Sequence, residues 1–430
     1  MTKKSTSIAR TRKTDESKDE DHPIDLAIKN LFDATGDYRQ AAISVLPSVA
    51  KKLLSDLKKN KNRLKKYNNH VDGEGNIIVS EAHEVKEILD ILNENEELIR
   101  SKILSSITRS FYIGLFSNFD SFIGELLKGI YSKKPDLFNK IKREIPLNEL
   151  VNYSSIEEIK KDILEEEIDS FRRDSYILQF SALETTFNIK TLKDFPEWPE
   201  FVECSQRRNL ITHNDGKVNQ QYLTIINKEK YNHSEKPKIG DALEIDPEYL
   251  LKSIFLINKV GFMLAHTLWK KVLPEEVKTA NDCMNNSIYY LLNKKRWRMA
   301  AEIGCFALNE MMAKNIESMT KMIRVVNTSI ALKNSKQETE AFKLLDSVDW
   351  SASIREFKLA NAVLKDNYTE AANIMGEIGK KGELIDEVSY YRWPLFETFR
   401  GSQEFQDAFF NVYSKPFKDQ LAKDIETKFK

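Results

Sequence analysis

Ile103–Ile130, ILSSITRSFYIGLFSNFDSFIGELLKGI, lies in the most apolar segment of the chain, which begins at about Glu97. Its apolar residues recur every three to four positions, the spacing that places side chains on one face of an α-helix. Asp120 is the polar residue inside it. We therefore predict a long helix at the centre of a helical bundle, with a buried stripe of Ile103, Ile107, Phe111, Leu115, Phe119, Phe122, Leu126 and Ile130.

The composition also favours helices. Of 430 residues, 31% are charged, and there are only 14 glycines and 11 prolines, so an all-α fold is expected rather than a sandwich or barrel. The length allows two or three domains, each with its own core. The formal net charge is zero, so any contact with RNA has to be a local basic patch rather than a global field.

Arg207–Asn219, RRNLITHNDGKVN, is the stretch in which residues suited to chemistry come together. On a helix, Asn209 and His213 are four residues apart and share a face, and Arg208 lies close beside it. A guanidinium binds phosphate in a planar fork, and an imidazole exchanges protons near neutral pH. Asn209 is suited to hydrogen-bond one ring nitrogen and so orient the other. The trio suggests RNA cleavage by the 2'-hydroxyl.

The core of this pattern is an arginine followed by a polar residue, three further residues and a histidine. Such a pattern often arises by chance, so the surrounding residues have to support it. Here the pattern is preceded by Arg207 and continued by Asn214, Asp215, Gly216, Val218, Asn219 and Tyr222. With these residues the sequence resembles the HEPN superfamily, and in particular its bacterial defence and toxin proteins. The resemblance covers about Glu97 to about Val272, and the pair Leu126 and Leu127 is similar to the end of the opening HEPN helix.

The resemblance implies a metal-independent endoribonuclease that leaves a 2',3'-cyclic phosphate and uses no cofactor. It implies catalytic roles for Arg208, Asn209 and His213. HEPN domains dimerise, which implies a homodimer whose two motifs meet at one site, and in some relatives an acid of the opening helix, here Asp120, approaches that site. Substrate binding is implied for Arg207, Asn214, Asn219 and Tyr222.

Two other functions stay open. In one of them, the HEPN-like core is catalytically silent, and the protein acts as a binding or scaffold module through its helical repeats. In the other, the chain is the toxin half of a pair, with its tyrosine or motif region modified or neutralised by a cognate antitoxin. His233, in a loop with Pro237 and Gly240, is either a surface residue or a second catalytic histidine.

We expect four regions: a disordered tail over residues 1–22, an N-terminal helical unit over 23–96, a HEPN-like domain over 97–274, and a helical-repeat domain over 275–430. A turn is expected at Asp72–Asn76. The helix before it carries a basic run that is either a solvated face or a phosphate-binding patch: Lys51, Lys52, Lys58, Lys59, Lys61, Arg63, Lys65 and Lys66.

The C-terminal region carries a degenerate internal repeat. KKRWRMAAEIG (294–304) aligns with KDNYTEAANIMGEIG (365–379), with Trp297 over Tyr368 and Ala300 over Ala371. The offset of about seventy residues is twice the period of about 34 that is typical of tetratricopeptide-like helical pairs. We predict a short helical solenoid that offers a surface to a protein partner or regulator; a plain helical bundle is the alternative.

Cys204, Cys283 and Cys305 are too few and too scattered for a disulfide framework or a zinc site. No run reaches the roughly eighteen apolar residues of a membrane span, and the basic N-terminus lacks the apolar core of a signal peptide. The sequence therefore predicts a cytoplasmic protein with no membrane contact.

Overall fold

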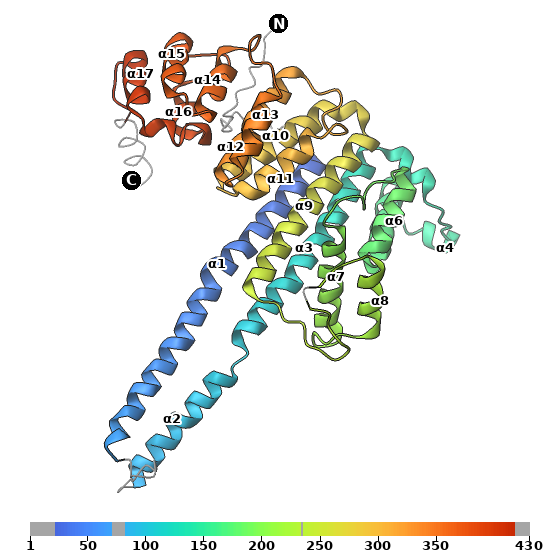
Figure 1. Cartoon of the computed structure of the whole chain (residues 1–430). Coiled ribbons are helices and arrows are strands. Elements are labelled where there is room, and N and C mark those ends of the chain that lie inside the picture. Colours follow the sequence, from blue (N-terminus) through green and yellow to red (C-terminus); the bar gives the residue numbers. More distant parts are fainter. Residues whose placement is uncertain (1–21, 71–81, 234, 418–430) are drawn as a thin grey trace. The chain divides into compact units, whose positions relative to one another are not determined.

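The computed structural model describes residues 22–70, 82–233 and 235–417, and every regular element in those ranges is a helix (Figure 1). Isolated β-bridges join Lys217 to Ala242 and Lys381 to Asp386. The predicted all-α class is confirmed. The predicted tail, apart from His22, and the predicted turn at residues 72–76 lie outside the described residues.

The chain divides into two compact units, Leu26–Gly261 and Met1–Asp25 with Phe262–Lys430. The helices of the first unit are α1 (Pro23–Leu64), η1 (Lys65–His70), α2 (Ala82–Arg100), α3 (Ile103–Lys133), η2 (Pro135–Lys140), α4 (Leu147–Leu150), α5 (Ile156–Arg173), α6 (Tyr176–Phe187), α7 (Trp198–His213), α8 (Gln220–Lys228) and the larger part of α9 (Pro247–Val272).

Helix α3 is the core helix of this unit, as the apolar stripe predicts. The stripe was wrong at Ile103, which is 49% exposed because it begins α3 just after the break that follows α2. Leu115, Phe119, Ile123, Leu126 and Ile130 have no exposed surface. Helices α5 and α7 pack along α3, and α6 packs on α7. The Phe119 ring centroid lies 5.7 Å from that of Phe201 on α7 and 5.5 Å from that of Tyr176 on α6. These aromatic contacts hold α7 against α3.

The N-terminal helices belong to the same compact unit as α3 rather than to a separate one. The first half of α1 lies on the core, where the buried Thr35 hydroxyl donates to the Asn258 side chain of α9 at 2.7 Å. Toward their far ends, α1 and η1 bond to α2: Arg63 Nη1 lies 2.7 Å from Glu94 Oε2, and the Tyr67 hydroxyl of η1 donates to Glu87 at 2.8 Å. We call residues 43–64 of α1 together with α2 the arm (Figure 1).

The second unit contains the end of α9, followed by η3 (Pro274–Glu276), α10 (Val277–Asn293), α11 (Trp297–Leu308), α12 (Ser318–Asn334), α13 (Glu338–Asp346), α14 (Arg355–Leu364), α15 (Tyr368–Ile378), α16 (Glu387–Arg392), η4 (Pro394–Phe396), η5 (Phe399–Gly401) and α17 (Gln403–Tyr413). Helices α10 to α13 each pack on the next, α14 packs on α12, and α15 packs on α14. This is the packing of antiparallel helical hairpins with short connections.

One turn geometry recurs in three of these hairpins, α10–α11, α12–α13 and α14–α15. Two residues before the second helix, the backbone is left-handed, with φ of 53° at Lys295, 65° at Lys336 and 57° at Asp366. The next amide then donates over 2.9 Å to the carbonyl five residues back, at Leu291, Leu332 and Ala362. The fourth residue of each second helix is a buried alanine: Ala300, Ala341 and Ala371.

The unit around α3 holds Cys204, which is buried, and the other unit holds Cys283, buried, and Cys305, exposed. Across the described part of the chain, no helix is both long enough and apolar enough to span a membrane.

Candidate functional site

The candidate catalytic motif lies at the C-terminal end of α7 (Trp198–His213). Pro199 sits in the first turn, where a proline is tolerated, and neither proline nor glycine interrupts the helix after it. The helix ends because Asp215 and Gly216 adopt left-handed backbone angles, with φ of 49° and 76°. The predicted helix, and its end at Gly216, are confirmed.

One side of α7 is buried and the other carries the motif. Phe201, Val202 and Leu210 are no more than 3% exposed. Arg208 and Asn209 are half-buried at the edge of that apolar side, and His213 is exposed in the last helical turn. The half-buried guanidinium of Arg208 and the exposed imidazole of His213 therefore lie on one helix within about two turns of each other.

Asp120 of α3 holds the guanidinium of Arg208. Arg208 Nη2 lies 3.2 Å from Asp120 Oδ2, and both side chains are about one quarter exposed, at 28% and 21%. The other Asp120 oxygen accepts a hydrogen bond of 2.5 Å from the hydroxyl of Tyr176 on α6. Burial raises the pKa of the Asp120 carboxyl, and the hydrogen bond from Tyr176 and the charge of Arg208 oppose that rise. Three helices thus converge on Arg208.

Asn209 was expected to hydrogen-bond a ring nitrogen of His213, and it bonds Arg208 instead. Its side-chain oxygen accepts from Arg208 Nη1 at 3.1 Å. Within the described residues, no hydrogen bond joins Asn209 to the His213 ring. Asn209 therefore helps to orient the guanidinium, which already bonds Asp120, and the imidazole stands alone on the exposed end of the helix.

The loop after His213 is held by ionic and backbone contacts. Arg109 Nη1 of α3 lies 2.8 Å from Asp215 Oδ1, and the hydrogen bond and charge from Arg109 lower the pKa of Asp215, with Lys102 and Lys217 adding smaller effects. Gly216 accepts a backbone bond from Leu243 at 2.9 Å, and Val218 donates to Asp241 at 2.9 Å. The excursion after α8 thus returns to pair with this loop, and Arg109 forms an ion pair with Asp215.

Arg207 and Tyr222, expected at the substrate, contact a buried carboxylate instead. Glu203 is 1% exposed and its Oε1 accepts from Arg207 Nε and from the Tyr222 hydroxyl, both at 2.8 Å. Its Oε2 accepts from the hydroxyl of Tyr249 on α9 at 2.5 Å. The Arg207 guanidinium also lies 4.0 Å from the centre of the Tyr249 ring. This Glu203 cluster joins α7, α8 and α9.

His233 lies beside the Glu203 cluster. Its Nε2 is 3.1 Å from the Tyr222 hydroxyl, and its ring packs edge-on against Tyr231 at 4.7 Å. Burial lowers the pKa of His233; the charge of Glu203 opposes that effect, and the charge of Arg207 adds to it. The side chain is half-buried rather than a free surface histidine.

The two asparagines of the extended motif bond the backbone locally. Asn214 Nδ2 donates to the carbonyl of Lys217 at 2.6 Å, and Asn219 Oδ1 accepts the amide of Tyr222 at 2.9 Å as the N-cap of α8. Such bonds shape the loop after α7. Arg208, Asn209 and His213 therefore lie together at the C-terminal end of α7. Arg207 and Tyr222 bond Glu203 instead, and Asn214 and Asn219 bond the backbone.

Asp120 is an expected neighbour of the site, whereas Tyr176 and Arg109 are not among the expected site residues. A signal for Arg109 exists, since it precedes Asp120 by eleven residues, which is about three helical turns, and therefore shares its face of α3. Nothing local in the sequence marks Tyr176. Its hydroxyl reaches Asp120 only because α6 packs beside α7, and this packing depends on the tertiary fold.

Among the side chains that the structure describes, no group of three or more His, Cys, Asp or Glu is arranged to hold a metal ion. No protein-family model, curated protein or solved structure matches the chain.

Proposed function

We propose that this chain is a metal-independent endoribonuclease with its site at the C-terminal end of α7. The observation that supports this most directly is the Arg208 guanidinium, fixed by Asp120 and Asn209, on the same helix as the exposed His213. A fixed cation and an exchangeable proton are what transfer of a phosphodiester to a neighbouring hydroxyl requires.

In the proposed reaction, the ribose 2'-oxygen attacks the adjacent phosphorus and the bond from phosphorus to the 5'-oxygen breaks. His213 takes the proton of the 2'-hydroxyl or returns one to the leaving 5'-oxygen. Arg208 stabilises the negative charge on the phosphoryl oxygens in the transition state. The products are a 2',3'-cyclic phosphate and a free 5'-hydroxyl. DNA is inert because it lacks the nucleophile.

Asp120 is proposed as a positioning residue. An arginine side chain loses considerable rotamer freedom when it is fixed. Because the ion pair with Asp120 already orders Arg208 in the free protein, less of this entropy is lost when substrate binds. Arg109, which pairs with Asp215 beside the motif, and the exposed Lys102 and Lys217 are proposed to supply the local basic patch that a chain of zero net charge needs to attract RNA.

Because one histidine does not readily serve both ends of the reaction, we propose a homodimer in which two α7 motifs meet. By its resemblance to the HEPN superfamily, the protein acts in the cytoplasm as part of a bacterial defence or toxin system. The repeated hairpin turn of α10–α15 supports a tetratricopeptide-like region there, which we propose as the surface for a regulator.

The test is cleavage of a mixed RNA pool by the purified chain in the presence of chelator, comparing the native protein with His213→Ala. General acid-base groups contribute about 100-fold to 10,000-fold in rate, so His213→Ala is expected to lose at least about 100-fold. Because His213 is exposed, the variant keeps the melting temperature of the native chain.

His83→Ala is the matched control, since it removes an exposed histidine from α2 and is expected to cut at the native rate. The fragments of the native reaction should carry cyclic phosphates. A His213→Ala variant that retains more than about a tenth of the native rate, or an activity that chelator abolishes, contradicts the proposal.

A further inference from the structure

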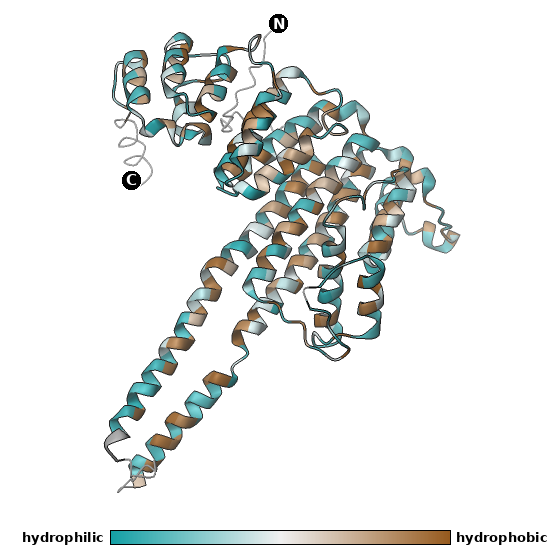
Figure 2. Cartoon of the chain, viewed as in Figure 1, coloured by the Kyte–Doolittle hydropathy of each residue, from teal (hydrophilic) through white to brown (hydrophobic). Residues whose placement is uncertain are grey.

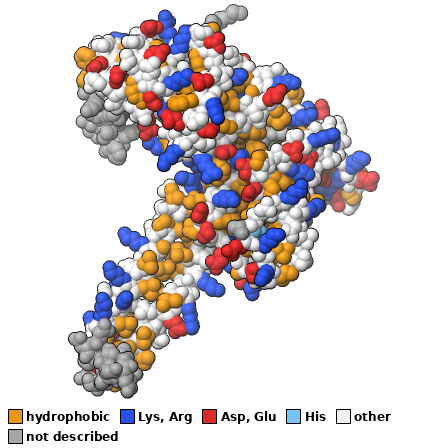
Figure 3. Space-filling model, viewed as in Figure 1, with side chains coloured by type: hydrophobic (Ala, Val, Ile, Leu, Met, Phe, Trp, Pro, Cys, Tyr) orange, Lys and Arg blue, Asp and Glu red, His pale blue; other side chains and the backbone are white. Residues whose placement is uncertain are grey.

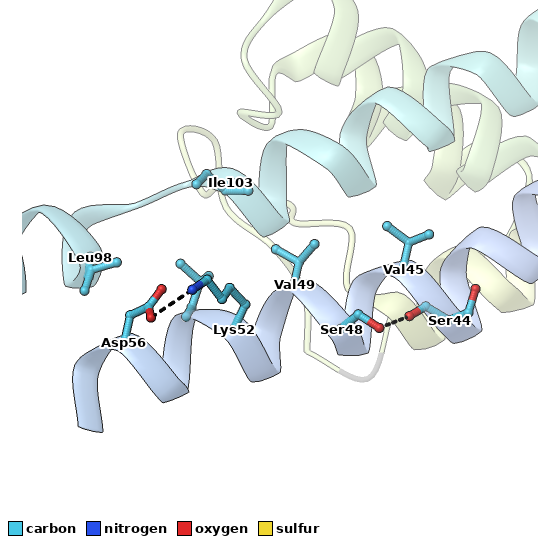
Figure 4. Close-up of a pocket in the computed structure, with 9 residues that line it drawn as sticks. Ser44, Val45, Ser48, Val49, Lys52, Asp56, Leu98 and Ile103 are labelled. Atoms are coloured by element: carbon cyan, nitrogen blue, oxygen red, sulfur yellow. Dashed lines mark hydrogen bonds and ion pairs between the residues drawn. The ribbon is translucent and has the colours of Figure 1, made fainter. Parts of the chain in front are cut away.

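The arm leaves an apolar groove open on one side. The groove has a volume of about 740 Å³, and Val45 and Val49 point from α1 toward the side where Ile103 lies (Figure 4). It exists because α2 ends at Arg100 and α3 begins at Ile103, so the break between them leaves α1 uncovered. The lining residues are Ser44, Val45, Ser48, Val49, Lys52, Leu53, Asp56, Leu98 and Ile103.

Helix α2 has two apolar faces, and α1 covers only one of them. Ile88 and Ile91 are at most 6% exposed and form the covered face. The second face runs along α2 with alternating spacings of four and three residues, and its apolar members are 43% to 72% exposed. We call this face the seam: Val85, Leu89, Leu92, Glu96 and Ile99.

The spacing of the seam indicates what kind of partner covers it. Alternating steps of four and three residues give a period of 3.5, which keeps a stripe facing a neighbouring helix along its whole length. Hydrophobic residues alternate with hydrophilic ones along both arm helices in Figure 2, and Figure 3 shows hydrophobic side chains on the surface of the arm. Contiguous exposed apolar surface of this kind marks an interaction site. The partner is therefore helical.

The charges of the arm indicate which chain supplies the partner helices. From residue 51 to residue 66, α1 and η1 carry eight basic residues and one acid, Asp56. Helix α2 carries six acids (Glu84, Glu87, Asp90, Glu94, Glu96 and Glu97) and two basic residues (Lys86 and Arg100). A partner that suits both helices has to present an acidic helix to α1 and a basic helix to α2.

The arm of this same chain presents that pair of helices. We propose that the arm binds the arm of a second copy, with α1 of each copy beside α2 of the other and the seams and grooves closed between them. Such a contact uses the same surface on both copies, which is the usual form of a twofold interface. Opposite charges across it add specificity and speed the encounter.

This proposal does not depend on ribonuclease activity, and it concerns a different surface from the α7 motif. The first test mixes isotopically labelled and unlabelled full-length chains and treats them with a zero-length reagent that joins lysines to carboxylates. Cross-links between α1 lysines of one copy and α2 acids of the other are expected. Their absence from a mixture at tens of micromolar overturns the proposal, whatever the chain does to RNA.

Two variants show whether the seam carries the contact. Leu89→Glu with Leu92→Glu places charges on exposed seam positions and is expected to abolish the arm cross-links. Leu178→Glu, at a leucine that is 55% exposed on α6, is the matched control and should keep them. Both variants should melt like the native chain, since each alters exposed side chains. Cross-links that survive the double substitution contradict the proposal.

A charge swap tests the identity of the partner. Lys58→Glu with Lys61→Glu in one variant, and Asp90→Lys with Glu97→Lys in another, should each weaken arm association roughly tenfold or more, because like charges then face each other. An equimolar mixture of the two variants should restore it. A mixture that cross-links no better than either variant alone rules out a second copy as the occupant.

Discussion

Arg207 and Arg208 are neighbours in sequence with opposite surroundings. The Arg207 side chain is 11% exposed and bonds Glu203, while that of Arg208 is 28% exposed and bonds Asp120. Adjacent residues on a helix point about 100° apart, so one arginine enters the contact with α8 and α9 and the other faces α3 at the edge of the bundle. Of these two arginines, Arg208 is the more exposed, and it is therefore the candidate for a contact with the proposed phosphate.

Asp120 should leave a signature in the pH dependence of stability. Its carboxyl has a raised pKa in the folded state because of burial, so its contribution to stability is complete below the unfolded pKa of about 3.9 and is lost as pH rises through the folded value. We expect urea unfolding from pH 4 to pH 7 to show that the free energy of unfolding of the native chain falls relative to that of Asp120→Asn as pH rises. A difference that grows in favour of the native chain contradicts this assignment.

At the scale of elements, the Glu203 cluster bonds α7 to α8 and α9, beside the apolar contact of Leu210 with Tyr222 and Ile226. We expect Glu203→Gln to lower the free energy of unfolding by about 3 to 5 kcal/mol, since it leaves the Arg207 charge buried without its counter-ion. Denaturant titration measures the change. Glu248→Gln, at an exposed position in the first turn of α9, is the control and should stay within about 0.5 kcal/mol of the native chain.

The recurring turn of the C-terminal hairpins carries backbone strain. Lys336 is exposed and has φ of 65°, a conformation that glycine adopts without steric cost. Lys336→Gly should therefore raise the stability of that unit by about 0.5 to 1 kcal/mol, after the entropy that glycine adds to the unfolded chain. Lys336→Ala keeps the strain and should show no gain in thermal or chemical unfolding. Equal effects of both substitutions would mean that the backbone angle is not the cause.

At the scale of the whole molecule, the three cysteine thiols differ in burial, and their reactivity should therefore report which of them lie at the surface. Burial raises the pKa of Cys204 to about 11 and that of Cys283 well above its ordinary value, whereas Cys305 is exposed. Thiolates rather than thiols react with alkylating reagents. Native protein at pH 7.5 should therefore take up one label per chain quickly, at Cys305, and three in urea. Mass spectrometry of the labelled peptides decides this, and fast labelling of Cys204 or Cys283 would contradict the described packing.

Much of the helical organisation was predictable because its signals are local. The apolar stripe of Ile103–Ile130, the proline at the start of α7 and the glycine after its end each act within a few residues. The start of α9 at Pro247 is a further case, in which Asp246 accepts the amide of Tyr249 at 2.7 Å. The membership of α1 and α2 in the α3 unit was not predictable, because it depends on contacts between residues such as Thr35 and Asn258.

The sequence by itself determined an all-helical chain, a central apolar helix, and a helix that carries Arg208, Asn209 and His213 together. The tertiary structure alone decided that Asp120, eighty-eight residues before Arg208, meets its guanidinium, and that Arg207 and Tyr222 are held by a buried carboxylate. The physical reason is that helix periodicity orders side chains around one axis, whereas the packing of α3, α6, α8 and α9 around α7 decides which of those side chains water can reach.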